Sequence, residues 1–278
     1  MRLLLLAGGT FLLLIALQMG RHVLTGAVSP SWKSVVFVVA ALATCALMIM
    51  AYRAGVRLLE QRTAMEIAFG ERFWLFLPGA FLGFAIFAVV YAILWAAGIA
   101  HYEGFGQWNS ALRACSAALA AAVGEEIVFR GAVFRLVNER FGTTAALLFS
   151  AALFGLLHLA NPGATLVSTI AIALESGVLL AVAFLGARTL WLPIGIHFGW
   201  NFTEGSVFGA AVSGGQSEGI FKFSLNGADL FTGGAFGPEA SVIAVVVCLA
   251  VSAIFFWAVV RQRSWRPFQM RSIKGAVA

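Results

Sequence analysis

Several ionisable and amide side chains lie inside apolar segments of this 278-residue chain. A charged side chain at the centre of a bilayer costs about 2.5–3.5 kcal/mol on insertion scales, so such residues usually face the protein interior and have a function. Here they occur in the segments AAVGEEIVFRGAVFR, ALLFSAALFGLLH and LWLPIGIHFGWNF. The candidate functional residues are Glu125, Glu126, Arg130, His158, His197 and Asn201.

The two adjacent glutamates are predicted to differ in their surroundings. Glu126 and Arg130 are four residues apart, so on a helix they share a face and can pair. Glu125 points about 100° away around the same helix and has no partner there. A carboxylate without a cationic partner is free to accept a proton, which suits a general base. We therefore expect Glu125 to be the reactive member of the pair and Glu126 to be supportive.

The histidines add further chemistry from two other segments. His197 and Asn201 are four residues apart and share one helix face, and Gly195 and Gly199 permit close helix packing around them. His158 lies at the end of its apolar segment. A glutamate pair, two imidazoles and an amide that converge from three helices can hold and activate a water molecule for attack on a carbonyl.

Composition places these residues in a membrane protein. The chain is 61% hydrophobic and 11% charged, with a mean hydropathy of +0.95. Soluble domains average roughly 45–50% apolar and about 25% charged residues. The net charge of +6 gathers at the ends of apolar segments, which indicates membrane topology and contact with lipid headgroups and not nucleic-acid binding.

Eight apolar segments approach the roughly 20 residues that a helix needs to cross a bilayer. They cover residues 3–20, 34–52, 74–98, 112–134, 143–160, 165–185, 189–211 and 240–261. The Gly-, Ser- and Asn-rich segment 212–239 is predicted to be a loose extracytoplasmic loop. We therefore predict an all-α fold, a polytopic transmembrane helical bundle of about eight spans.

The distribution of cations supports a cytoplasmic N-terminus and a cytoplasmic C-terminus. If all eight segments cross, thirteen of the eighteen Lys and Arg residues lie on the cytoplasmic side. These are Arg2, Arg53, Arg57, Arg62, Arg72, Arg135, Arg140, Arg188, Arg261, Arg263, Arg266, Arg271 and Lys274. Arg21, Lys33, Arg113 and Lys222 lie on the other side. Such an excess is typical of cytoplasmic loops.

Three motifs in this order resemble the CPBP family of intramembrane proteases, which includes the CAAX prenyl endopeptidases and the bacterial Abi proteins. The motif EExxxR corresponds to Glu125–Arg130, FxxxH to Phe154–His158, and HxxxN to His197–Asn201. The resemblance covers residues 110–205, which would form the catalytic core of a single membrane domain, 1–278. Residues 1–109 would add N-terminal transmembrane helices.

The resemblance implies a role for each motif residue in an endopeptidase. Glu125 would activate the water and His158 would help position it. His197 and Asn201 would bind the water or a metal, or stabilise the oxyanion. Glu126 and Arg130 would support them. Glu175 and Glu204 lie outside the motifs.

Two chemistries fit these residues. In one, Zn²⁺ binds some of Glu126, His158 and His197 and lowers the pKa of its bound water to about 7. In the other, no metal takes part, and Glu125 deprotonates a water while Asn201 and His197 stabilise the oxyanion. The sequence lacks HExxH, in which one helix supplies both histidine ligands. Both chemistries stay open at this point.

The expected partners are a peptide or protein substrate, lipidated in the CAAX type, and membrane lipids. The compact sequence with short loops favours the bacterial inner membrane as its location. Two alternatives from other classes are a proton-coupled transporter, because buried Glu, His and Arg also form proton relays, and a non-catalytic immunity or scaffold protein. No inverted repeat is evident in the sequence, which disfavours a transporter.

Overall fold

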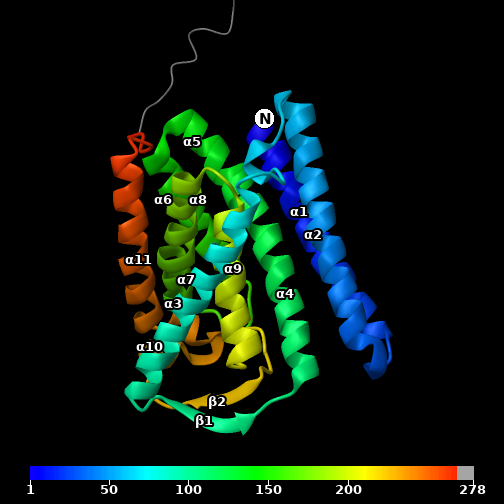
Figure 1. Cartoon of the computed structure of the whole chain (residues 1–278), viewed down its shortest axis with the longest axis vertical. Coiled ribbons are helices and arrows are strands. Elements are labelled where there is room, and N and C mark those ends of the chain that lie inside the picture. The colour runs from blue at the N-terminus through cyan, green and yellow to red at the C-terminus, as the bar shows by residue number, and fades with distance from the viewer. Residues whose placement is uncertain (268–278) are drawn as a thin grey trace, which may run out of the picture.

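The computed structural model describes residues 1–267, and almost all of its regular structure is helical (Figure 1). The main helices are α1 (Arg2–Ala27), α2 (Pro30–Glu60), α3 (Phe76–Ala96), α4 (Trp108–Glu126), α5 (Arg135–Phe141), α6 (Thr143–His158), α7 (Leu166–Ile172), α8 (Val178–Ala187), α9 (Trp191–Asn201) and α11 (Val242–Arg261). Within this range, α10 (Asp229–Thr232) and several 3-10 turns complete the helical elements.

Three of these helices continue through π-helical turns. Segment η3 (Ile127–Phe134) joins α4 to α5, η4 (Ala173–Gly177) joins α7 to α8, and η5 (Phe202–Val207) extends α9. When the helices joined by π-helical turns are each counted as one segment, the main helices of the described residues form eight segments. These overlap the eight apolar segments predicted from the sequence. Both α1 and α2 extend well beyond the predicted residues 3–20 and 34–52.

Five helices are long and apolar enough to cross a membrane, and the chain is an integral membrane protein. They are Leu4–Ala27, Pro30–Glu60, Phe73–Ala96, Leu166–Ala187 and Val242–Arg261. α6 is a shorter apolar helix. The crossing of eight segments and the orientation in the membrane therefore stay predictions.

The two ends of the bundle differ in character. The N-terminus, α5 and the end of α11 lie at one end, opposite the β1–β2 sheet (Figure 1). Several of the cations expected in the cytoplasm belong to helix ends at this side of the bundle: Arg57 near the end of α2, Arg135 at the start of α5 and Arg261 at the end of α11. Arg271 and Lys274 lie outside the described residues.

The segment predicted to be a loose loop is ordered, which corrects that expectation. Residues 212–239 contain β2 (Phe221–Leu225), which pairs antiparallel with β1 (Ala100–Phe105). The loop that precedes α11 packs inward, with Phe236 and Glu239 buried. This small sheet also departs from a purely all-α fold.

An ion-pair network closes the end of the bundle at which α2 ends. Arg135 on α5 pairs with Glu60, and Arg62 pairs with Glu66 at 2.8 Å. Burial alone would raise the pKa of Glu66, but hydrogen bonds from Arg62 and Tyr52 outweigh it and hold that pKa below its usual value. The Tyr52 hydroxyl also lies 2.8 Å from the carbonyl oxygen of Gly131. The network thus fixes α2 to η3, directly after the two glutamates.

Helices α3 and α9 pack through glycines, as the sequence predicted for Gly195 and Gly199. A Cβ atom at Gly199 would overlap the carbonyl oxygen of Ala80, and one at Gly83 would overlap that of Ile196. The absence of side chains here lets the two backbones touch. His197 and Asn201 are therefore positioned by direct backbone contact between two helices.

We expect Gly199→Ala to destabilise the protein by about 1–3 kcal/mol, because a well-packed interface must separate to admit the methyl group. The measurement is the unfolding midpoint of purified protein in detergent. Gly20→Ala is the matched control, since nothing lies within 4 Å of a Cβ there, and alanine favours a helix. Equal midpoints for the two variants would contradict this packing argument.

Candidate active site

The carboxylate of Glu126 connects the candidate residues. Its Oε1 atom lies 2.8 Å from a guanidinium nitrogen of Arg130 and 2.9 Å from Nδ1 of His197. The side chains of Glu126 and Arg130 are completely buried. The i,i+4 pairing predicted from the sequence is thus confirmed, and His197 is a second partner that the sequence did not reveal.

Arg130 also ties this group to another helix. Its second terminal nitrogen donates a hydrogen bond of 2.6 Å to the carbonyl of Ser176, in η4. Its guanidinium carbon lies 4.7 Å from the ring centroid of Phe154, on α6. The buried charge therefore contacts one carboxylate, a helix carbonyl and an aromatic face, while the Nε atom of Arg130 has no hydrogen-bond partner among the described residues.

Glu125 occupies a more open position than its neighbour. Its side chain is 19% exposed, whereas that of Glu126 is 0% exposed. Its Oε2 atom lies 4.0 Å from Nε2 of His197. This distance is too long for a hydrogen bond, but one water molecule can bridge two polar atoms at such a separation.

The tautomer of His197 follows from its contact with Glu126. A carboxylate only accepts hydrogen bonds, so Nδ1 carries the hydrogen that points to Glu126. Nε2, on the side of Glu125, then has a free lone pair in the neutral ring. Glu126 is thus the group that orients His197. This role is more specific than the supportive role that the sequence indicated.

His158 contacts both the backbone carbonyl and the ring of Phe154, the first residue of its motif. Its Nδ1 lies 2.7 Å from the Phe154 carbonyl oxygen and donates to it, because a carbonyl can only accept. The Phe154 ring centroid lies 4.6 Å from that of His158 and 6.4 Å from that of His197. Phe154 therefore contacts His158 and Arg130 and lies beside His197.

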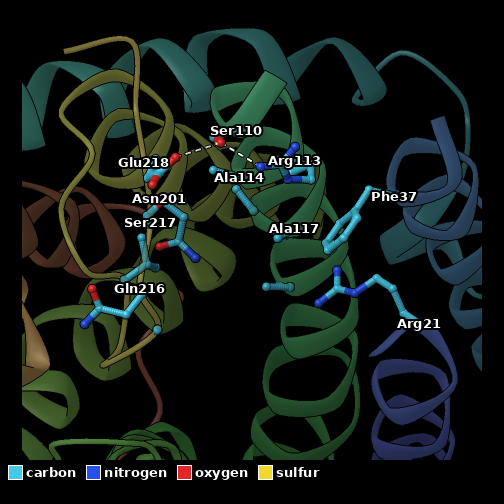
Figure 2. A pocket seen from close by; sticks show the side chains of 14 residues that line it. Arg21, Phe37, Ser110, Arg113, Ala114, Ala117, Asn201, Gln216, Ser217 and Glu218 are labelled. Carbon is cyan, nitrogen blue, oxygen red and sulfur yellow. Dashed lines mark hydrogen bonds between the residues drawn. The ribbon is translucent and has the colours of Figure 1, made fainter. Parts of the chain in front are cut away.

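Asn201 ends α9 one turn beyond His197 and faces a cavity of about 640 Å³ (Figure 2). The cavity is lined on one side by Asn201 and residues 215–218, and its floor is the alanine-rich face of α4 from Ala114 to Ala121. The floor ends one turn before Glu125. Of the predicted site residues, only Asn201 lines this cavity.

The tentative zinc ligands do not form a compact ligand group. Within residues 1–267, no three His, Cys, Asp or Glu side chains gather in a way that could hold a metal ion. Oε1 of Glu126 is already engaged by a guanidinium and an imidazole hydrogen, whereas the buried Oε2 has no hydrogen-bond partner among the described residues. The arrangement of Glu126, His158 and His197 therefore does not fit a metal site, and we derive no step through a metal.

A second group of carboxylates lies outside the motifs. Glu175 in η4 and Glu204 in η5 are completely buried, and Glu239, which precedes α11, is 3% exposed. Glu239 is close enough to interact electrostatically with both. Both carboxylate oxygens of Glu175 and of Glu204 lack a hydrogen-bond partner among the described residues. The sequence indicated Glu175 and Glu204 by their apolar surroundings, but gave no signal for Glu239.

A helical membrane bundle that holds carboxylates, imidazoles and an amide in its interior defines the general class of this protein. Residues 107–203 match the family model described as Type II CAAX prenyl endopeptidase Rce1-like. The resemblance predicted from the three motifs is thus confirmed, and residues 107–203 are similar to the CAAX endopeptidase family. The family implies a CAAX-type intramembrane protease. Neither the comparison with curated proteins nor that with solved structures gave a match.

We expect Glu126→Gln to destabilise the protein by about 3–5 kcal/mol, because it leaves the fully buried Arg130 without a counter-charge. The matched control is Glu139→Gln. Glu139 forms an i,i+4 ion pair with Arg135, and its side chain is 54% exposed. Such exposed pairs contribute about 1 kcal/mol or less. Chemical denaturation in detergent measures both, and similar losses would contradict the central position of Glu126.

Proposed function

We propose that this protein is an intramembrane endopeptidase in which Glu125 activates a water molecule for attack on a peptide bond. The observation that carries the proposal is the pair formed by Glu125 Oε2 and His197 Nε2, 4.0 Å apart. One atom belongs to a partly exposed carboxylate, and the other to an imidazole whose opposite nitrogen is held by Glu126. Two acceptors at this separation suit the two hydrogens of one water molecule.

Hydrolysis then follows from the chemistry of these groups. Glu125 takes a proton from the water as the water oxygen bonds to the carbonyl carbon of the substrate, whose oxygen becomes an oxyanion. Glu125 then returns the proton to the amide nitrogen. The C–N bond breaks, and the carbonyl re-forms as a carboxyl group beside a free amine.

Asn201 and His158 are assigned to the substrate side of this reaction. The Asn201 side chain has no protein hydrogen-bond partner among the described residues, and its amide can donate to the developing oxyanion. His158 has its Nδ1 hydrogen engaged by the Phe154 carbonyl, which leaves Nε2 available to help position the water. The ion pair of Glu126 and Arg130 supports the reaction indirectly, because Glu126 holds the ring of His197 in one orientation.

The substrate class is a peptide or protein segment at the membrane. The family match supports a CAAX-type substrate with a prenylated cysteine, and the apolar surface of the helices would bring a lipidated chain and the site together in the bilayer. A bacterial inner-membrane location stays part of this proposal.

The decisive variant is Glu125→Gln, which keeps the size of the side chain but cannot take up a proton. We expect kcat to fall by about 10²–10⁴-fold, with the unfolding midpoint unchanged. Release of a fluorescent fragment from a farnesylated peptide in liposomes measures it. Glu139→Gln, on the same continuous helix, should retain full activity. Full activity of Glu125→Gln would refute the assignment of the base.

The same variants separate the alternative functions. A transporter would give proton-coupled uptake into liposomes that survives Glu125→Gln. An immunity or scaffold protein would protect cells even when Glu125, His158 and His197 are all substituted. Either result, together with no peptide release by the unsubstituted protein, would replace the protease proposal.

The metal-free form of the mechanism makes its own prediction. Activity should persist after incubation with a strong zinc chelator, because the proposed steps use only Glu125, His197 and their neighbours. Elemental analysis of the active, chelator-treated protein should then find zinc far below one atom per chain. Loss of activity on chelation that zinc alone restores would favour the zinc chemistry.

A further inference from the structure

The cavity beside Asn201 contains an arginine that forms no ion pair with any other described residue. Arg21, near the end of α1, lines this cavity and is half-buried. Within residues 1–267 it forms no ion pair with any acidic side chain. A cation inside a membrane protein is normally paired or faces a ligand or a water-filled cavity, because desolvation of an isolated charge is unfavourable.

A second arginine in the same cavity is already engaged. Arg113 on α4 donates a hydrogen bond of 2.6 Å to the Ser110 hydroxyl, and that hydroxyl lies 3.0 Å from a carboxylate oxygen of Glu218. Figure 2 shows Arg21, Phe37 and Arg113 along one side of the cavity, with Asn201 and Glu218 on the other. Two cations thus face one carboxylate, and Arg21 is the one left free.

The rest of the lining suits a peptide. The floor consists of small alanine side chains from α4, and Phe37 of α2 adds an apolar wall. Asn201, Gln216 and Ser217 offer polar groups that can hydrogen-bond to a peptide backbone. A volume of about 640 Å³ lies within the range of about 300–1,000 Å³ typical of ligand sites.

The position of the cavity connects it to the proposed chemistry. Ala121, at the end of its floor, lies four residues before Glu125 on one face of α4, a rise of about 6 Å along the helix. Asn201 lines the cavity and belongs to the proposed site. A peptide lying along the floor would therefore have the bond to be cleaved near Glu125 and the residues that follow this bond beside Arg21.

We propose that this cavity binds a carboxylate of the peptide substrate, and that Arg21 is the specificity residue that pairs with it. The inference rests on the proposed function and adds to it a requirement for negative charge on the substrate. The carboxylate is either the C-terminus of the peptide or an acidic side chain. Arg21 and Phe37 come from α1 and α2, which lie outside the family match at residues 107–203. The N-terminal helices would thus contribute selectivity.

The test compares three farnesylated fluorescent peptides that differ at one end. The first has a free C-terminal carboxylate, the second a C-terminal amide, and the third the amide with an aspartate as its last residue. We expect the full-length protein to favour the first over the second by about 10- to 100-fold in kcat/KM, as a charge-assisted hydrogen bond would give. Cleavage of the third peptide at the rate of the first would identify a side-chain carboxylate as sufficient.

Variants of the arginine assign the preference. Arg21→Gln should abolish the preference for acid over amide, and Arg21→Lys should retain part of it. Arg2→Gln, which removes an exposed arginine of the same helix, should change nothing. An acid preference that is unaltered in Arg21→Gln would overturn the proposal, as would cleavage by the unsubstituted protein without any preference.

Binding separates this proposal from the protease proposal. In a Glu125→Gln background, fluorescence anisotropy should show tighter binding of the acid peptide than of the amide, and Arg21→Gln should remove the difference. That result without any cleavage by the unsubstituted protein would uphold the carboxylate site and refute the protease. Equal binding of acid and amide, or no binding of either, would refute the carboxylate site whatever the cleavage assay shows.

Discussion

One carboxylate holds the centre of this membrane domain together. Glu126 receives a guanidinium hydrogen from Arg130 and an imidazole hydrogen from His197, in a place from which water is excluded. In such surroundings an ionic group persists only when all of its partners are in position. The contact therefore fixes α4, η3 and α9 relative to one another, and through the bond of Arg130 to Ser176 it reaches η4 as well.

The packing of the helices makes this contact possible. The glycine-lined interface brings the backbones of α3 and α9 together, and His197 lies between two of those glycines. Directly after Glu126 and directly after Asn201 the helices change to π-helical turns, which often occur at functional sites. The neighbouring Glu125, turned about 100° from Glu126, remains partly exposed. Two identical side chains thus acquire different surroundings from a step of one residue along the helix.

The chain divides its proposed tasks between two parts. The segment that matches the CAAX endopeptidase family model, residues 107–203, carries Glu125, His158, His197 and Asn201. Helices α1 and α2 precede it and pack beside it, against η3 and α4 (Figure 1). They contribute Arg21 and Phe37 to the cavity next to Asn201. A reactive centre with a cavity wall supplied by other helices would let one chemistry serve different peptides.

Features that depend on spacing within one helix could be predicted from the amino-acid sequence. It predicted the eight helical segments, the pair of Glu126 and Arg130, and the close packing at Gly195 and Gly199, because helical periodicity and apolar length are local properties. It also predicted the family, from three short motifs.

Which helices meet could not be predicted from the sequence and follows from the packing of the folded chain. The contact of His197 with Glu126, the approach of Glu239 to Glu175 and Glu204, and the β1–β2 sheet join residues far apart in the chain. The sequence predicts only that Arg21 is one of the few cations on the non-cytoplasmic side of the membrane. In the folded chain Arg21 lines a cavity. Such contacts depend on the packing of side chains between helices, which no spacing along a single helix can specify.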